Sequence, residues 1–243
     1  MSLVGGAAVA VAALSQFVPA SAVSSGSFYD AINTTRVMDT RTTGTTLGPG
    51  GTTTLCLLTA CGAPSNLIGH LFATAVSLNV TVTNTTAASF LTAYPAGTTR
   101  PTVSNLNWVA GQTVANAVVV PIGTSGTNDG AITFYNNQGK ADVVVDLNAE
   151  FTTHTAAAYV PVSPTRIADT RVASGYPNAG QTMTAGETEN FLVQGEGPVP
   201  TTPEVRGVVL NVTVTDTTAA SFLTVWNNGD ESMPVASTLN WAA

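Results

Sequence analysis

The residues best suited to chemistry in this chain form a small cluster of opposite charges that occurs twice. The first cluster comprises Arg36, Asp39 and Arg41, and the same spacing recurs 130 residues later in Arg166, Asp169 and Arg171. An arginine fork can bind a carboxylate or sulfate, and an aspartate can accept from a sugar hydroxyl, so a ligand contact is one interpretation. The other is structural, because half-buried charges are normally paired. On a regular strand, Asp39 and Arg41 would share one face and Arg36 would not.

Large aromatic residues also recur at matching positions. Tyr94 corresponds to Trp226, and Trp108 corresponds to Trp241. Such rings can stack on sugars from a sheet edge, or they can fill the core, where each buries a large area. The candidate ligand-binding residues are therefore Asp39, Arg41, Tyr94, Trp108, Asp169, Arg171, Trp226 and Trp241.

Three carboxylates, Asp142, Asp146 and Glu150, occupy even positions of one expected strand. Calcium prefers oxygen ligands, but carboxylates on one strand lie about 7 Å apart for each step of two residues. We therefore predict no metal site and no cofactor. Hydrolase and zinc-protease motifs such as GxSxG and HExxH do not occur, so we predict that the chain is not an enzyme. A glycosidase with paired carboxylates is the weakest alternative.

The charge content limits the classes of partner. Only 9% of residues are charged and the net charge is −7, with seven lysines and arginines. Typical soluble domains carry about 25% charged residues. Because no basic stripe exists, nucleic acid and anionic lipid are not expected partners.

The N-terminal residues predict export. An apolar stretch over 3–14 precedes Pro19-Ala20-Ser21-Ala22, which is typical of a secretory signal cleaved after Ala22. The stretch is too short for a membrane span, and because no Lys or Arg precedes it, a buried N-terminal helix or an anchor is the alternative. In an exported protein, Cys56 and Cys61 are expected to form a local disulfide, and a pair of reduced structural thiols is the alternative. We therefore predict an extracellular or cell-surface protein with a signal peptide at 1–22.

An internal repeat organises the rest of the chain. The blocks TRVMDTR, LNVTVTNTTAASFLTAY and SNLNW recur in the same order as TRIADTR, LNVTVTDTTAASFLTVW and STLNW, at offsets of 130, 132 and 133. This predicts two copies of one module, at 29–152 and 159–243, with linkers at 23–28 and 153–158. The second copy lacks a counterpart for the last strands of the first. We expect either a longer parent protein or a strand donated by another subunit.

Short strands separated by Gly, Pro and Asn turns predict an all-β fold, namely an antiparallel sandwich of Ig-like or jelly-roll-like kind. Residues 77–83 alternate Leu78, Val80 and Val82 with polar neighbours, so one face is expected in the core. We predict one hairpin over 77–94 and a second formed by 131–136 and 141–147. The run Val143–Val145 is typical of a strand covered on both faces.

The blocks TRVMDTR, LNVTVTNTTAASFLTAYPAG, SNLNW, GQTVANAVVVPIG and ADVVVDLNAEF resemble a repeat found in secreted and cell-surface proteins of actinobacteria. That repeat often stands in tandem or beside cell-wall or polysaccharide hydrolases. The resemblance covers 29–151 fully and 159–243 in part. It implies an extracellular β-module without an activity of its own, and it assigns no catalytic residues.

Two functions follow from these observations. The first is a binding module for cell-wall or environmental polysaccharide that serves in surface attachment. The second is a structural spacer or adhesin-like stalk that acts through protein–protein contacts, including self-association through the second copy. Exposed, clustered Trp108, Tyr94 and Arg41 would favour the first function. Buried aromatic residues and an inward Asp39–Arg41 pair would favour the second.

Overall fold

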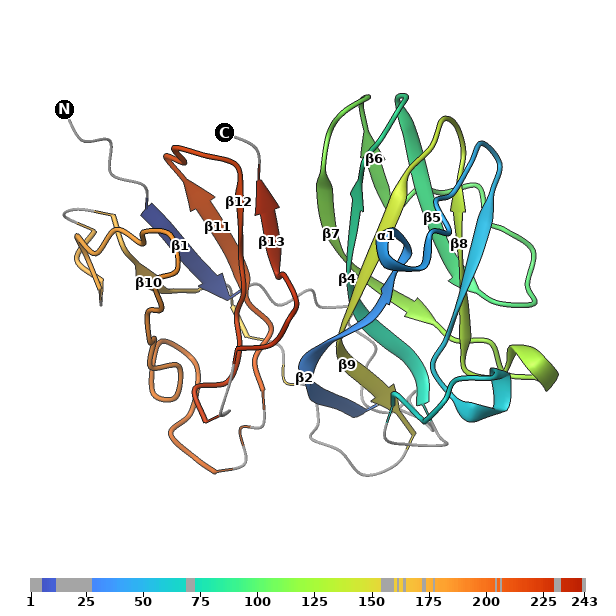
Figure 1. Cartoon of the computed structure of the whole chain (residues 1–243). Coiled ribbons are helices and arrows are strands. Elements are labelled where there is room, and N and C mark those ends of the chain that lie inside the picture. Colours follow the sequence, from blue (N-terminus) through green and yellow to red (C-terminus); the bar gives the residue numbers. More distant parts are fainter. Residues whose placement is uncertain are drawn as a thin grey trace. The chain divides into compact units, whose positions relative to one another are not determined.

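A computed structural model describes residues 6–11, 28–68, 73–153, 160, 162–163, 165–171, 174–176, 178–203, 205, 207–229 and 233–241. The chain divides into two compact bodies (Figure 1). The larger consists of Ser27–Ala156 with Ser221–Ala242, and the smaller of Met1–Gly26 with Ala157–Ala220 and Ala243. The predicted cleavage site after Ala22 lies outside the described residues, but residues 6–11 of the predicted signal peptide form strand β1 (Gly6–Val11) of the smaller body.

The larger body is an antiparallel β-sandwich, which confirms the predicted fold class. Its two four-stranded sheets have the strand orders β2-β9-β4-β7 and β3-β8-β5-β6 (Figure 1). The strands are β2 (Phe28–Asp39), β3 (Thr52–Cys56), β4 (Ala73–Thr83), β5 (Ser89–Pro95), β6 (Leu106–Trp108), β7 (Val114–Pro121), β8 (Ala131–Asn136) and β9 (Asp142–Thr152). The short helical turns are α1 (Thr40–Thr43), η1 (Thr59–Cys61) and η2 (Gly126–Asn128). None of the helices in the described part is long and apolar enough to cross a membrane.

The core lies between the two sheets, as the alternation on β4 predicts. Leu78, Val80 and Val82 are fully buried, and they meet Phe134 and Ile132 of β8 in one hydrophobic cluster. Strand β9 is central in its sheet, between β2 and β4. Its run Val143–Val145 is buried on both faces, which confirms that prediction.

Both predicted hairpins are wrong. Strand β4 pairs with β7 and β9, whereas β5 pairs with β6 and β8. Likewise β8 and β9 belong to different sheets. Each connection instead carries the chain from one layer of the sandwich to the other, through Asn84 (φ 52°) and Gly139 (φ 59°). Alternation of apolar residues fixes which face points inward, but it does not tell a hairpin from an arch between layers.

The smaller body contains a three-stranded sheet in the order β10-β1-β11, formed by Thr165–Asp169, Gly6–Val11 and Asn211–Thr215. Its register repeats that of β2-β9-β4. Ala8 lies opposite Asp169 and Thr213, just as Val144 lies opposite Asp39 and Thr81. Strand β1 therefore occupies the central position that β9 holds in the first copy.

The last described residues of the second copy belong to the larger body. Strands β12 (Ser221–Leu223) and β13 (Leu239–Trp241) pair with each other in the same register as β5 and β6. β13 packs alongside β7, the edge strand of the first sheet. The sandwich thus carries a short hairpin from the second copy on the outer face of one sheet.

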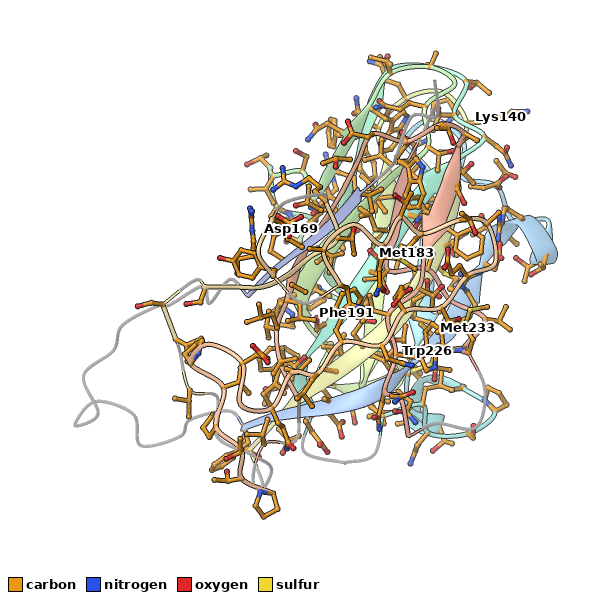
Figure 2. The ribbon with its side chains drawn as sticks, turned by 90° about the vertical axis from the view of Figure 1, so that its left-hand side faces the viewer. Lys140, Asp169, Met183, Phe191, Trp226 and Met233 are labelled. Atoms are coloured by element: carbon orange, nitrogen blue, oxygen red, sulfur yellow. A yellow bond between two sulfur atoms is a disulfide. The ribbon has the colours of Figure 1, made fainter. Side chains whose placement is uncertain are left out.

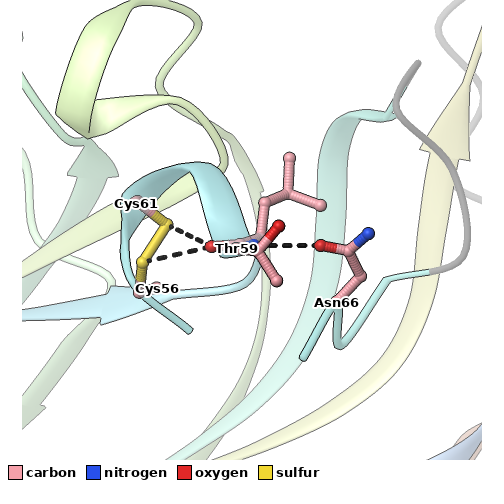
Figure 3. Close-up of a disulfide and its surroundings, with 5 residues drawn as sticks. Cys56, Thr59, Cys61 and Asn66 are labelled. Atoms are coloured by element: carbon pink, nitrogen blue, oxygen red, sulfur yellow. Dashed lines mark hydrogen bonds between the residues drawn. A yellow bond between two sulfur atoms is a disulfide. The ribbon is translucent and has the colours of Figure 1, made fainter. Parts of the chain in front are cut away.

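The predicted disulfide between Cys56 and Cys61 is present, which confirms that expectation (Figure 3). It ties the end of β3 to the turn η1. Both sulfur atoms lie close to the carbonyl oxygen of Leu58. The amide of Thr59 donates to Asn66 Oδ1 at 2.9 Å, so the bridged turn is also held to the following loop.

Candidate functional site

Asp39 ends strand β2 and begins the helical turn α1. Its side chain accepts from the backbone amide of Arg41 at 3.1 Å, which caps the turn. The Arg41 guanidinium folds back on the same carboxylate, with Nε–Oδ1 at 2.9 Å and Nη2–Oδ2 at 2.6 Å. Arg41 is therefore not on a strand, and the shared strand face predicted for Asp39 and Arg41 does not exist. This hydrogen bond from Arg41 holds the pKa of Asp39 below its usual value.

Arg36 joins the same network although a regular strand would turn it away. The register of β2 against β9 shifts between Arg36 and Met38, so one extra residue brings the Arg36 guanidinium to the cluster. Arg36 makes a two-pronged contact with the fully buried Asp146, through Nε to Oδ1 and through Nη2 to Oδ2 at 3.2 Å. A further contact reaches Asp39 at 3.4 Å. The first cluster is thus internally paired, as the structural interpretation expects.

The second cluster repeats this geometry (Asp169 is labelled in Figure 2). Arg166 contacts Asp169 at 2.9 Å, and Arg171 contacts the same carboxylate at 3.0 Å and 2.7 Å. The hydrogen bond from Arg171 lowers the pKa of Asp169 to about 2. Arg166 lies opposite Ala10 of β1, whereas Arg36, its counterpart in the first copy, lies opposite Asp146.

One of the candidate aromatic residues is buried and the other three are half-buried. Trp108 is 4% exposed and belongs to the core of the sandwich, because β6 directs it inward beside Leu106. Tyr94, Trp226 (labelled in Figure 2) and Trp241 are half-buried. The structure therefore does not gather Trp108, Tyr94 and Arg41 on one open surface.

The three carboxylates of β9 are buried. Asp142 accepts from Thr40, Thr46 and Asn84. Burial acts to raise its pKa, but these hydrogen bonds outweigh that effect and hold the pKa below the usual value. Glu150 is 1% exposed. Among the described residues, no group of three His, Cys, Asp or Glu side chains is placed to hold a metal ion.

A site that sequence reasoning missed lies on the outer face of the first sheet. Asn79 and Thr81 of β4 and Asp146 of β9 point away from the core, yet they are 4%, 6% and 0% exposed. We call these three residues the receptor face. They are covered by residues 233–241 of the second copy, which we call the second-copy segment.

The contact holds a peptide backbone at both of its polar groups. Asn79 Nδ2 donates to the carbonyl oxygen of Ser237, and the amide of Ser237 donates to Asp146 Oδ2 at 3.1 Å. Asn240 Nδ2 adds a bond to Thr81 Oγ1 at 3.3 Å. A buried carboxylate and a buried amide thus find their partners in another part of the chain. A contact between side chains and a peptide backbone produces no periodic pattern in the sequence. The only sign of this site in the sequence is that Asn79 and Asp146 are unusual residues for a strand.

Beside this contact lies an open hollow of about 320 Å³. Arg36, Arg41, Thr81 and Val144 form its wall on the sandwich, and Phe222, Met233 and Val235 form the opposite wall. Met233 is labelled in Figure 2. Phe222, Met233 and Val235 are 55%, 53% and 85% exposed, so the hollow keeps an apolar, solvent-facing side.

No family model, curated protein or solved structure matches the chain. The resemblance to an actinobacterial cell-surface repeat and the assignment of the module as non-catalytic therefore stay predictions.

Proposed function

We propose that this chain is a non-catalytic architectural protein. It acts as a spacer or stalk, and protein–protein contacts couple its module copies. The observation that carries the proposal is the pair of hydrogen bonds that Asn79 and Asp146 of the receptor face make with the backbone of Ser237.

Burial at this contact supports an architectural role. Asp146 is fully buried and paired with Arg36, and its Oδ2 also accepts from the amide of Ser237. The repeated arginine clusters are occupied by their own aspartates, which leaves little capacity for a sugar or sulfate. Trp108, one of the candidate aromatic residues, lies in the core, where it is not accessible to a polysaccharide.

Replacement of Asn79 by alanine tests the proposal. The variant loses the bond to the Ser237 carbonyl and leaves that oxygen without its partner, at a cost of about 1 kcal/mol. Hydrogen exchange of peptides covering 233–241, followed by mass spectrometry, should therefore become about fivefold faster. Asn211→Ala is the matched control, because Asn211 holds the same repeat position in the second copy and is exposed. Equal exchange in both variants and the wild type would refute the coupling.

Polysaccharide binding is the competing function, and a direct assay separates the two. The full chain is mixed with insoluble cell wall, chitin, cellulose and an α-glucan, and the retained fraction is measured. We expect no retention on any polymer. Retention that disappears in an Arg41→Ala or Trp226→Ala variant of unchanged stability would overturn the architectural proposal and place the site at that residue.

A further inference from the structure

The first copy contains a segment with the same structure as the second-copy segment. Residues 100–108, here called the first-copy segment, align with 233–241 at the offset of 133. Thr92 Oγ1 donates to the Val103 carbonyl at 2.6 Å, as Thr224 Oγ1 donates to the Ala236 carbonyl at 2.6 Å. Asn107 contacts Ser104 Oγ at 3.0 Å, and Asn240 contacts Ser237 Oγ at 3.0 Å. Both segments are therefore held in one backbone conformation by equivalent bonds.

The two segments differ in what covers them. Ser237 and Ala236 are 8% and 5% exposed because they lie on the receptor face. Their counterparts Ser104 and Val103 are exposed, Val103 by 56%. Within the described residues, the amide of Ser104 meets no acceptor comparable to Asp146.

The surface around the first-copy segment also matches the apolar wall described above. An open hollow of about 310 Å³ is lined by Phe90, Arg100, Thr102, Val103 and Ser104. The equivalent residues of the second copy line the hollow beside the receptor face, and they are Phe222, Met233, Val235, Ala236 and Ser237. The first-copy segment thus has the same kind of surface as the second-copy segment, but no sheet covers it.

A matching sheet surface is also exposed. Asn211 and Thr213 of β11 hold the repeat positions of Asn79 and Thr81, and both are exposed where the first-copy residues are buried. At the position of Asp146 this sheet has the backbone of Ala10. It can therefore offer two of the three polar contacts of the receptor face, which predicts a weaker interaction.

We propose that the first-copy segment of one molecule docks on the Asn211–Thr213 surface of a second copy of this chain, so that molecules associate head to tail. The proposal rests on the coupling inferred under Proposed function. A segment on one molecule and its acceptor on the next form a heterologous contact, which builds a ring or an open chain and not a symmetric dimer. The partner is therefore another identical molecule, and the assembly grows beyond a dimer as the concentration rises.

Sedimentation velocity of the full chain over a wide concentration range tests this, with two blocking variants. Val103→Glu places a charge at the position that is buried in the docked second-copy segment, where Ala236 is the counterpart. Thr213→Arg places a long side chain on the Asn211–Thr213 surface. The wild type should form species larger than a dimer at high concentration, and each variant alone should stay monomeric. Val109→Glu is the matched control, since Val109 is 62% exposed and lies just outside the segment, and it should associate like the wild type.

An equimolar mixture of the two blocked variants distinguishes a head-to-tail contact from a symmetric one. The Thr213→Arg chain keeps its segment and the Val103→Glu chain keeps its acceptor, so the mixture should form a heterodimer and nothing larger. A wild type that stays monomeric, a Val103→Glu variant that still associates, or a mixture without a dimer would each overturn the inference. Hydrogen exchange of residues 233–241 in the same wild-type sample separates the two proposals. If residues 233–241 are protected from exchange but the molecules do not associate, only this inference is refuted. If residues 233–241 are not protected, the intramolecular coupling is refuted as well.

Discussion

Asp39 and Asp169 each organise the chain at a single position. Each carboxylate accepts the backbone amide and the guanidinium of the arginine two residues later, and each also contacts the arginine three residues earlier. The sequence located both clusters because charges are rare in this chain. It could not give their geometry, because the arrangement depends on the register shift beside Arg36 and on the turn that begins after Asp39.

The low pKa of Asp169 predicts how stability depends on pH. An aspartate in an unfolded chain has a pKa of about 3.9, and Arg171 lowers that of folded Asp169 to about 2. Its contribution is therefore fully present above about pH 4 and is lost as the pH falls toward 2. Asp169→Asn should lower the urea midpoint at pH 7 and differ progressively less from the wild type below pH 4. Asp129→Asn, at the end of the turn η2 in the larger body, is the control, and a pH-independent difference for Asp169→Asn would contradict this account.

The disulfide acts on a short loop, so its contribution should be modest. Cys56 and Cys61 are five residues apart, and a loop of that size is worth about 2 kcal/mol in the chain-entropy description. The Cys56→Ser, Cys61→Ser variant should lose about this much free energy of unfolding in a urea titration. Reduction of the wild type should give the same loss. A variant as stable as the oxidised wild type would show that the bridge does not contribute to the fold.

At the scale of strands, the sequence predicted which residues point inward but not which strands pair. Leu78, Val80 and Val82 alternate as the core face of β4 requires, and all are buried. The same pattern would suit a hairpin with β5, yet β5 lies in the opposite sheet. The sequence did not predict the pairing, because Asn84 and Gly139 adopt the positive φ that a turn needs both in a hairpin and in a connection between the two sheets.

The position of β1 makes a testable prediction about β10 and β11. Gly6–Val11 pairs with both strands, so removal of residues 1–22 should leave their facing amides and carbonyls unpaired. Hydrogen exchange over 165–169 and 211–215 should then rise strongly. Exchange over β2 and β4, whose central partner β9 is retained, should not change and provides the internal control. Unaltered exchange at β10 and β11 would show that β1 does not hold this sheet in solution.

At the scale of the whole molecule, the repeat supplies both sides of a contact. Each copy carries an LNW segment, and each carries an Asn-Val-Thr strand whose polar side chains can receive it. The sequence revealed the repeat and predicted the sandwich. It did not predict that Asn79, Thr81 and Asp146 hold a segment from the other copy, because that contact joins residues about 90 to 160 positions apart.

The coupling is tested most directly by two amides of the wild-type chain in dilute solution. Ser237 and Ser104 hold the same repeat position, but only the Ser237 amide donates to the buried Asp146. A hydrogen bond to a charged group is worth about 1.5–3 kcal/mol, so residue-resolved hydrogen exchange should be at least about tenfold slower at Ser237, after correction for intrinsic rates. Equal exchange at the two serines would mean that the receptor face does not hold the second copy, and the architectural account would fail.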